Sequence, residues 1–506
     1  MTKLGLEKNV INYENLEASI ERFAENGIQL PTFKELSDPE CISDKVKEEL
    51  KNMDPNIMHP LNLYRINWYN DENNKNFRKT PYYFILPKEI TGVDAKIVVM
   101  AGAFFPIVQC HKVLAAYGCL APRVVTGQFN PLKHKAIWPS TGNYCRGGIA
   151  VSRIMNCRGV AILPEEMSEE RFSWLKKWVL DPENDIHRTY GCESNVKEIY
   201  DKCNELDKEE DNVIFNQFCE FGNALIHYLC TGKAIEKIFH DVVKESNNSN
   251  LKLKGYVSAT GSAGTLSAGD YLKDNNYKDC KIVAVEASEC PTLLCNGFGA
   301  HNIQGIGDKH IPYIHNVINT DFATGVSDSS TDSLYILFNT EEGKKFLKEQ
   351  KKVSNDTIQK LSLMGLSSIC NTIAAIKLAK YNNMTENDVI ITVATDPAFM
   401  YKTEEKKIKE KYFKDGYSEL TMAEIYGQHI KGITTDNLLE LTKIDRDRIF
   451  NLGYYTWVEQ QNVDIKDFIA RKDTKFWSEL RKFIPIWDNM IIEFNEKVRN
   501  HKLFKK

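Results

Sequence analysis

The sequence feature that most constrains the fold is an alternation of short apolar runs with helical patterns, which begins near residue 94. The apolar runs are 95–101, 123–126, 158–163, 253–259, 281–286 and 388–394. Helical patterns separate them near 111–119, 145–156, 168–179, 265–273 and 368–380. Strands that alternate with helices are typical of βαβ units, which build parallel sheets. The sequence therefore predicts an α/β fold.

Changes of texture along the 506 residues predict four segments. They are a mostly helical N-terminal extension (1–78), a first α/β domain (79–240), a second α/β domain (241–405) and a charged, helical C-terminal extension (406–506). A chain of this length commonly holds two or three domains. We expect Trp457, Trp477 and Trp487 of the last segment to pack against other residues rather than to bind a ligand.

Composition argues against several classes of protein. The formal net charge of -4 gives no reason to expect nucleic acid or an anionic membrane surface as a partner. The 13 cysteines include no Cys-x-x-Cys pair, as expected of reduced intracellular thiols rather than a disulfide framework. The N-terminus lacks the apolar core of a signal peptide, and no apolar stretch is long enough to cross a bilayer. We therefore expect a cytoplasmic protein, and we assign it no metal site.

The segment 256–272, YVSATGSAGTLSAGDYL, joins an apolar run to a helical pattern through a loop of small residues. The loop consists of Gly261, Ser262, Ala263, Gly264 and Thr265. Backbone N–H groups in such a loop can converge on an anion at the start of a helix, where the helix dipole adds to the attraction. Taken alone, the segment fits a tight turn without a ligand equally well.

Two other segments carry groups that could react with or hold a substrate. Lys112 stands where a loop gives way to a helix in largely uncharged surroundings, which would lower the pKa of its amine and suit a Schiff-base nucleophile. On its own, a solvated lysine at the start of a helix is by far the better interpretation, because the chain has dozens of lysines. The turn Ser140-Thr141-Gly142-Asn143 follows the strand-like run KAIWP, and its donors could bind a carboxylate or simply begin a helix.

Polar residues within apolar surroundings mark two more candidate positions. Gln217, Asn223 and His227 lie in the mostly apolar segment 215–232, where a histidine alone is more often structural. The stretch IQGIG at 303–307 contains Gly305, which suggests a backbone that approaches a ligand closely.

Taken in order, these segments resemble the fold-type-II pyridoxal-phosphate enzymes, in particular the cysteine synthase and cystathionine β-synthase branch. The resemblance covers roughly 80–405 and also includes Thr80-Pro81, QFCEFGNALIH at 217–227, TGSAGT at 260–265 and GLSSICNTIAAIKLAK at 365–380. It implies two open, twisted, mainly parallel sheets flanked by helices, as in the β-subunit of tryptophan synthase, and a homodimer.

The resemblance also implies a role for each site residue. Lys112 would form the Schiff base with pyridoxal 5'-phosphate, the loop 261–265 would hold the phosphate, and Asn143 would contact the cofactor ring. Ser140, Thr141, Gly142, Asn143, Gln217 and Gly305 would bind the amino-acid substrate. The implied reaction is β-elimination or β-replacement on cysteine, serine or an O-activated serine.

The chain departs from the family pattern at three positions. The lysine segment reads VQCHKVL at 108–114 instead of a form close to Gly-Ser-x-Lys-Asp-Arg, and Tyr144 replaces a threonine. Aligned on Tyr401, Asp396 stands where most β-replacement members carry a serine facing the pyridine nitrogen, although a shift of one residue would present Thr395 instead. A carboxylate there would favour a protonated pyridine and a stronger electron sink. We therefore keep two alternatives, which are a deaminase, racemase or carbon–carbon lyase, and a catalytically inactive binding or regulatory homologue.

Overall fold

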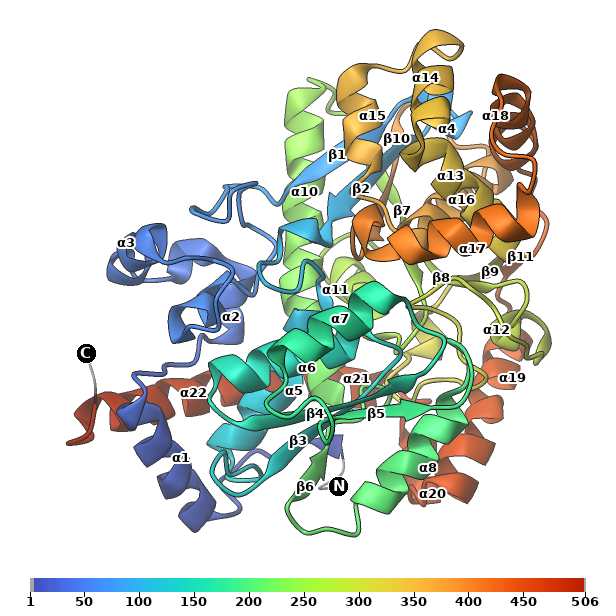
Figure 1. Ribbon diagram of the computed structural model, residues 1–506. Coiled ribbons are helices and arrows are strands. Elements are labelled where there is room, and N and C mark those ends of the chain that lie inside the picture. The colour runs from blue at the N-terminus through green and yellow to red at the C-terminus, as the bar shows by residue number, and fades with distance from the viewer. Residues whose placement is uncertain (1–3, 505–506) are drawn as a thin grey trace.

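The computed structural model describes residues 4–504, and its larger element is a seven-stranded sheet (Figure 1). In spatial order its strands are β1 (Tyr83–Leu86), β2 (Lys96–Ala101), β10 (Asp388–Ala394), β7 (Lys252–Ala259), β8 (Lys281–Ala287), β9 (Phe322–Val326) and β11 (Leu438–Glu440). The inner five strands run parallel, and only the edge strands β1 and β11 pair antiparallel to their neighbours. The inner strands are almost fully buried apolar runs, as expected of a parallel sheet covered on both faces.

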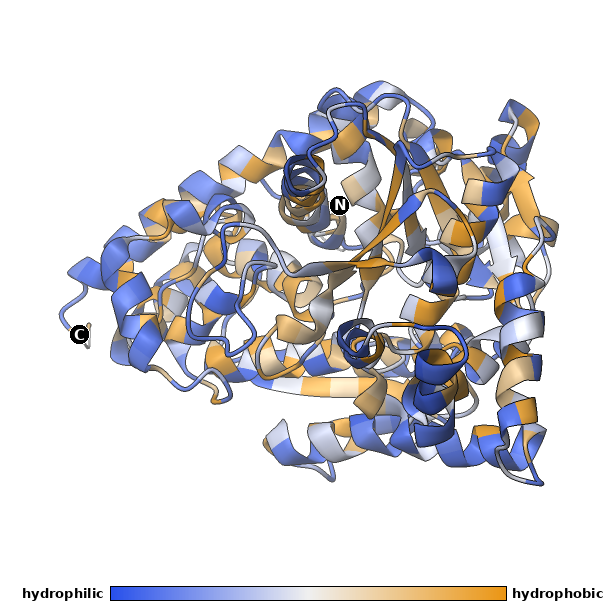
Figure 2. Cartoon of the chain, turned by 90° about the horizontal axis from the view of Figure 1, so that it is seen from above, coloured by the Kyte–Doolittle hydropathy of each residue, from blue (hydrophilic) through white to orange (hydrophobic). Residues whose placement is uncertain are grey.

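A second sheet has four parallel strands. Their spatial order is β5 (Ile186–Thr189), β4 (Arg158–Pro164), β3 (Lys135–Pro139) and β6 (Asn212–Ile214). Figure 2 shows hydrophobic residues concentrated along the strands, whereas the outer helices mix hydrophobic and hydrophilic positions. The predicted fold of two open, mainly parallel sheets flanked by helices is confirmed.

Helices cover both sheets close to the positions that the sequence predicts. Those of the smaller sheet's half are α5 (Lys112–Val125), α6 (Asn143–Ile154), α7 (Glu169–Trp178) and α8 (Val196–Leu206). Those of the larger sheet's half include α4 (Lys88–Thr91), α10 (Gly232–Glu245), α11 (Ser267–Asp274), α12 (Thr292–Cys295), α13 (Asp328–Asn339), α14 (Glu341–Glu349), α15 (Asn355–Leu361) and α16 (Leu366–Tyr381). The short helix α9 (Phe221–Ile226) packs against α5. The predicted strand at 123–126 is wrong, because Val124 and Val125 complete α5 and a short apolar run has the same appearance in a helix and in a strand.

The chain enters the larger sheet, leaves it for the smaller one and then returns. β2 pairs with β10 in parallel, with Ile97 opposite Ile390 and Ala101 opposite Ala394. Strands β1 and β2 therefore share a sheet with 252–394, although the sequence groups them with 79–240. The domain boundaries themselves stay a prediction.

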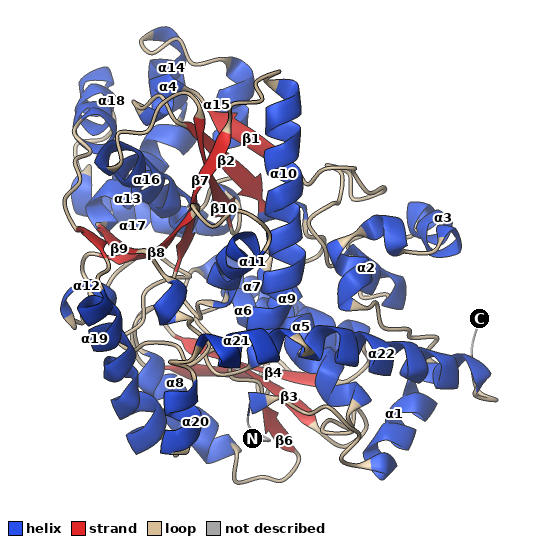
Figure 3. Cartoon of the chain, turned by 180° about the vertical axis from the view of Figure 1, so that it is seen from behind, coloured by secondary structure: helices blue, strands red, loops and turns tan. Residues whose placement is uncertain are grey.

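The two terminal extensions pack against each other (Figure 3). The N-terminal one contains α1 (Tyr13–Glu25), α2 (Phe33–Ser37) and α3 (Asp44–Asn52). The C-terminal one contains α17 (Lys402–Tyr412), α18 (Glu419–Tyr426), α19 (Lys443–Tyr454), α20 (Ile465–Ala470), α21 (Thr474–Arg481) and α22 (Phe483–Asn500). Phe23 meets Phe494 edge to face at 5.3 Å, and Asp488 accepts the backbone N–H of Phe33 at 2.6 Å.

The C-terminal extension differs in one respect from its helical prediction, because 438–440 forms the edge strand β11 beside β9. Trp457, Trp477 and Trp487 are all buried in packing contacts, as predicted. Within residues 4–504, no single helix is long and apolar enough to cross a membrane, although the bent pair α15 and α16 passes that test by length and composition.

Candidate active site

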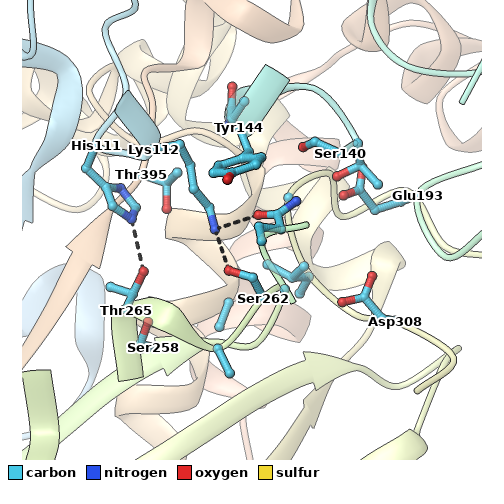
Figure 4. Close-up of a pocket in the computed structure, with 18 of the residues that line it drawn as sticks. His111, Lys112, Ser140, Tyr144, Glu193, Ser258, Ser262, Thr265, Asp308 and Thr395 are labelled. Atoms are coloured by element: carbon cyan, nitrogen blue, oxygen red, sulfur yellow. Dashed lines mark hydrogen bonds between the residues drawn. The ribbon is translucent and has the colours of Figure 1, made fainter. Parts of the chain in front are cut away.

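A cavity lies where strands of both sheets end (Figure 4). Its walls come from the turn after β3, the loop after β7 and the residue after β10. They include Ser140, Thr141, Asn143, Gly261, Ser262, Ala263, Thr265 and Thr395. In open α/β sheets, ligands bind outside the carboxyl ends of the strands. The cavity therefore has the expected position of a ligand site.

Lys112, the first residue of α5, projects into this cavity. Its Nζ donates to Ser262 Oγ at 3.1 Å and to Gln217 Oε1 at 3.4 Å. Burial lowers the pKa of the amine, so that more of it is in the neutral, nucleophilic form at a given pH. The preceding loop holds Ile107 and Gln109 at φ of 66° and 53°, and strained backbone of this kind is often found at functional sites. The structure thus brings Lys112, Gln217 and Ser262 together, although they are far apart in the sequence.

The loop 261–265 has the geometry of an anion cradle. Ala263 adopts φ of 63°, which turns the backbone between β7 and α11. Within residues 4–504, the N–H groups of 261–265 donate to no protein acceptor. A Cβ on Gly264 would lie 2.1 Å from Asn223 Oδ1, so the loop packs too closely for a side chain there. Free N–H groups on a small-residue loop before a helix fit a phosphate.

The turn 140–143 faces the cavity from the other sheet. Gly142 has φ of 135°, and a Cβ there would lie 2.5 Å from Arg171 Cδ, so only glycine fits. Ser140 Oγ accepts the N–H of Gly142 at 3.1 Å, and Asn143 begins α6. Gly305, at φ of 98°, also lines the cavity. These groups could bind a substrate carboxylate.

Of the sequence-predicted site residues, ten line the cavity and three do not. The ten are Lys112, Ser140, Thr141, Asn143, Gln217, Gly261, Ser262, Ala263, Thr265 and Gly305. Gly142 and Gly264 do not line the cavity, and they allow close packing against Arg171 and Asn223 respectively.

Asp396 requires a correction, because its side chain turns away from the cavity. The carboxylate is fully buried, where it accepts hydrogen bonds from Asn143 Nδ2 at 2.8 Å and from Tyr401 Oη at 2.9 Å. Arg171 Nη2 lies 3.8 Å from it. Thr395 lines the cavity instead. Neighbouring residues of an extended segment face opposite sides, so the structure has the register that the sequence analysis ranked second.

Other cavity residues were not predicted as site residues. They are His111, Tyr144, Glu193, Phe218, Ser258, Ala259, Ile306, Asp308 and Asn371. The position of Asp308 directly after the Gly-Ile-Gly stretch could have indicated it. No pattern in the sequence indicates Glu193, which reaches the cavity from the loop after β5.

Two acidic side chains of the cavity have raised pKa values. Glu193 and Asp308 are 1% and 6% exposed. Burial raises the pKa of Glu193 to about 7, although Arg171 opposes the shift, and burial also raises the pKa of Asp308 well above its ordinary value. Glu193 Oε2 lies 3.8 Å from Arg171 Nη1 in an ion pair. Asp308 Oδ2 and Asn371 Oδ1 are buried without a hydrogen-bond partner in the described chain. Such unpaired polar atoms fit a cavity that holds a polar ligand.

The fold and the position of the cavity agree with the resemblance to fold-type-II pyridoxal-phosphate enzymes. No known family model matches the chain. It is 26% identical to the yeast cystathionine beta-synthase over 286 residues, which is 55% of this chain and 51% of that protein. It is 26% identical to a Staphylococcus aureus cysteine synthase over 50% of this chain and 71% of that protein. It is 29% identical to Campylobacter jejuni cysteine synthase B over 50% of this chain and 75% of that protein.

Solved structures share the fold. A hydrogen sulfide-producing enzyme of Fusobacterium nucleatum superposes with a TM-score of 0.51 and 21% identity, covering 67% of this chain and 97% of that one. The O-acetylserine dependent cystathionine beta-synthase of Helicobacter pylori superposes with a TM-score of 0.51 and 21% identity, covering 64% of this chain and 94% of that one. These relatives confirm the resemblance to the cysteine synthase and cystathionine β-synthase branch, and the solved structures confirm its fold. The chain spans about half the length of the yeast relative.

Proposed function

We propose that this protein eliminates or replaces the β-substituent of a small amino acid, with cysteine, serine or an O-activated serine as substrate. The observation that carries the proposal is the position of Lys112, whose Nζ lies 3.1 Å from Ser262 Oγ in the anion cradle. A single molecule could thus reach the lysine while the loop holds its phosphate. Homodimerisation and a cytoplasmic location are further parts of this proposal that rest on the resemblance alone.

The residues of the cavity divide into separate roles. The N–H groups of 261–265 would hold the phosphate, and the donors of 140–143 with Gln217 would orient the substrate carboxylate. Pyridoxal phosphate, when bound, supplies an electron sink that stabilises negative charge at the substrate Cα. The amine of Lys112 would accept the proton from Cα, for which a lowered pKa is suitable.

The placement of Thr395 favours β-chemistry over the alternative reactions. The alternatives depended on a carboxylate at the pyridine nitrogen, but Asp396 is directed toward Asn143 and Tyr401 instead. We assign the hydroxyl of Thr395 to the ring nitrogen, where an uncharged partner leaves the sink modest. The inactive-homologue alternative loses support because the lysine, the cradle and the carboxylate turn meet in one cavity.

Spectroscopy and product analysis test the proposal. The purified protein should show a visible absorbance band with pyridoxal phosphate, and borohydride reduction should fix the phosphopyridoxyl group on the peptide that carries Lys112. Lys112→Ala should lose the fixed group, whereas the exposed control Lys345→Ala should keep it. Incubation with cysteine, serine and O-acetylserine should yield sulfide, pyruvate with ammonia, or a replacement product. A protein that stays colourless with added cofactor overturns the proposal.

A further inference from the structure

The N-terminal extension reaches the cavity through one aromatic side chain. Trp68 is 2% exposed, and its ring stacks on His111 with the centroids 5.4 Å apart and the planes at 24°. Its Nε1 donates to Thr231 Oγ1 at 2.9 Å, which fixes the plane of the indole. Phe105 meets the same indole edge to face at 4.9 Å. The extension thus packs directly on the residue that precedes Lys112.

His111 connects this aromatic contact to the anion cradle (Figure 4). Its Nε2 lies 3.1 Å from Oγ1 of Thr265, the last residue of the loop. Burial lowers the pKa of the imidazole to about 3, so the ring is neutral near pH 7 and carries one N–H. Nδ1 makes no well-aligned hydrogen bond in the described chain, although the nearby carbonyl of Thr395 opposes the lowering of the pKa.

The direction of the bond between His111 and Thr265 matters for an anion. If Nε2 accepts, the single proton of Thr265 is used on the imidazole, and the hydroxyl presents only lone pairs to the cavity. If Nε2–H donates, the hydroxyl keeps its proton for an anionic oxygen. An anion in the loop therefore favours the tautomer with the proton on Nε2. The backbone carbonyl of Thr395, which can only accept, favours a proton on Nδ1 instead, so the anion must outweigh that contact.

We propose that His111, held by Trp68, is a positioning residue that directs the Thr265 hydroxyl proton toward the phosphate in the loop 261–265. The contact with Trp68 assigns a role to the N-terminal extension, which lies outside the residues that resemble the family. The identity of the anion as the cofactor's phosphate rests on the proposed function. The role of His111 is to orient Thr265, so its effect should disappear when Thr265 cannot donate.

Cofactor affinity in a double-mutant cycle tests this inference. His111→Phe should weaken binding of pyridoxal phosphate about tenfold or more, the scale of a hydrogen bond to a charged group. His111→Gln, whose amide can donate from a similar position, should recover most of that loss. Thr265→Val should weaken binding similarly, and the double variant His111→Phe, Thr265→Val should bind no worse than Thr265→Val alone. Trp68→Phe, which keeps an aromatic ring but loses the bond to Thr231, should show a smaller loss.

Two further measurements separate this inference from the proposed function. Pyridoxal, which lacks the phosphate, should bind His111→Phe as well as wild type, and this result also shows that the variant is folded. Inorganic phosphate should raise the melting temperature of wild type more than that of His111→Phe, whether or not the protein proves to be an enzyme. Equal affinity of wild type and His111→Phe for pyridoxal phosphate, or additive losses in the double variant, would overturn the inference. If His111→Phe does not fold, Trp68→Phe provides the test instead, because it should also bind pyridoxal phosphate more weakly than wild type.

Discussion

Gly264→Ala is the change whose effect follows most directly from the packing of the anion cradle. The added methyl carbon would lie 2.1 Å from Asn223 Oδ1 and 2.5 Å from Asn223 Cγ, well inside van der Waals contact. Asn223 is fully buried, and its Nδ2 donates to Gln217 O and to Ser262 Oγ, each at 3.0 Å. The methyl group must therefore displace the side chain that connects two walls of the cavity.

The magnitude can be worked from these contacts. Two lost hydrogen bonds cost about 1 kcal/mol each, and an overpacked site adds about 1–3 kcal/mol. We expect the free energy of unfolding to fall by about 3–5 kcal/mol. Cofactor affinity should fall about tenfold or more, because Ser262 and Gln217 lose their common support. Urea unfolding followed by circular dichroism and absorbance titration with pyridoxal phosphate measure the two quantities.

Two variants make this experiment decisive. Gly427→Ala is the matched control, since a Cβ there meets nothing within 4 Å and stability should hardly change. Asn223→Ala removes the clashing group, so adding Gly264→Ala to it should cause little further loss. If Gly264→Ala bound the cofactor and unfolded like wild type, the close packing of Gly264 against Asn223 would be refuted as a determinant of the cradle.

The remaining predictions concern the charged groups around the cavity. Because the pKa of Glu193 is raised from 4.5 to about 7, its contribution to stability is present below pH 4.5 and is lost as pH rises through 7, by about 3 kcal/mol in total. In urea unfolding without added cofactor, Glu193→Gln should flatten this decline of the unfolding free energy with pH. The exposed control Glu183→Gln should leave the decline unchanged. Parallel pH profiles of stability for wild type and Glu193→Gln would contradict the assignment. Asp396→Asn should weaken cofactor binding by disturbing Asn143 while leaving the absorbance band of bound cofactor in place, whereas Thr395→Val should shift that band. The reverse pattern would restore Asp396 as the ring partner.

Much of the fold and most of the site could be predicted because they depend on local patterns. Buried parallel strands are continuous apolar runs, so 158–163 and 388–394 stand out without knowledge of their neighbours. The cradle at 261–265 and the turn at 140–143 are contiguous loops whose small residues reflect local backbone requirements. These two loops supply seven of the ten predicted residues that line the cavity, whereas the roles of Lys112, Gln217 and Gly305 came from the family resemblance.

What the sequence by itself determined was therefore much of the order of strands and helices, together with the two small-residue loops at 261–265 and 140–143. Only the tertiary structure decided which residues meet. The pairing of β2 with β10, the approach of Glu193 and the stacking of Trp68 on His111 join segments with no local pattern in common. The choice between Thr395 and Asp396 depends on a single-residue register at the end of β10, which long-range packing sets because each step along an extended chain reverses the face of the side chain.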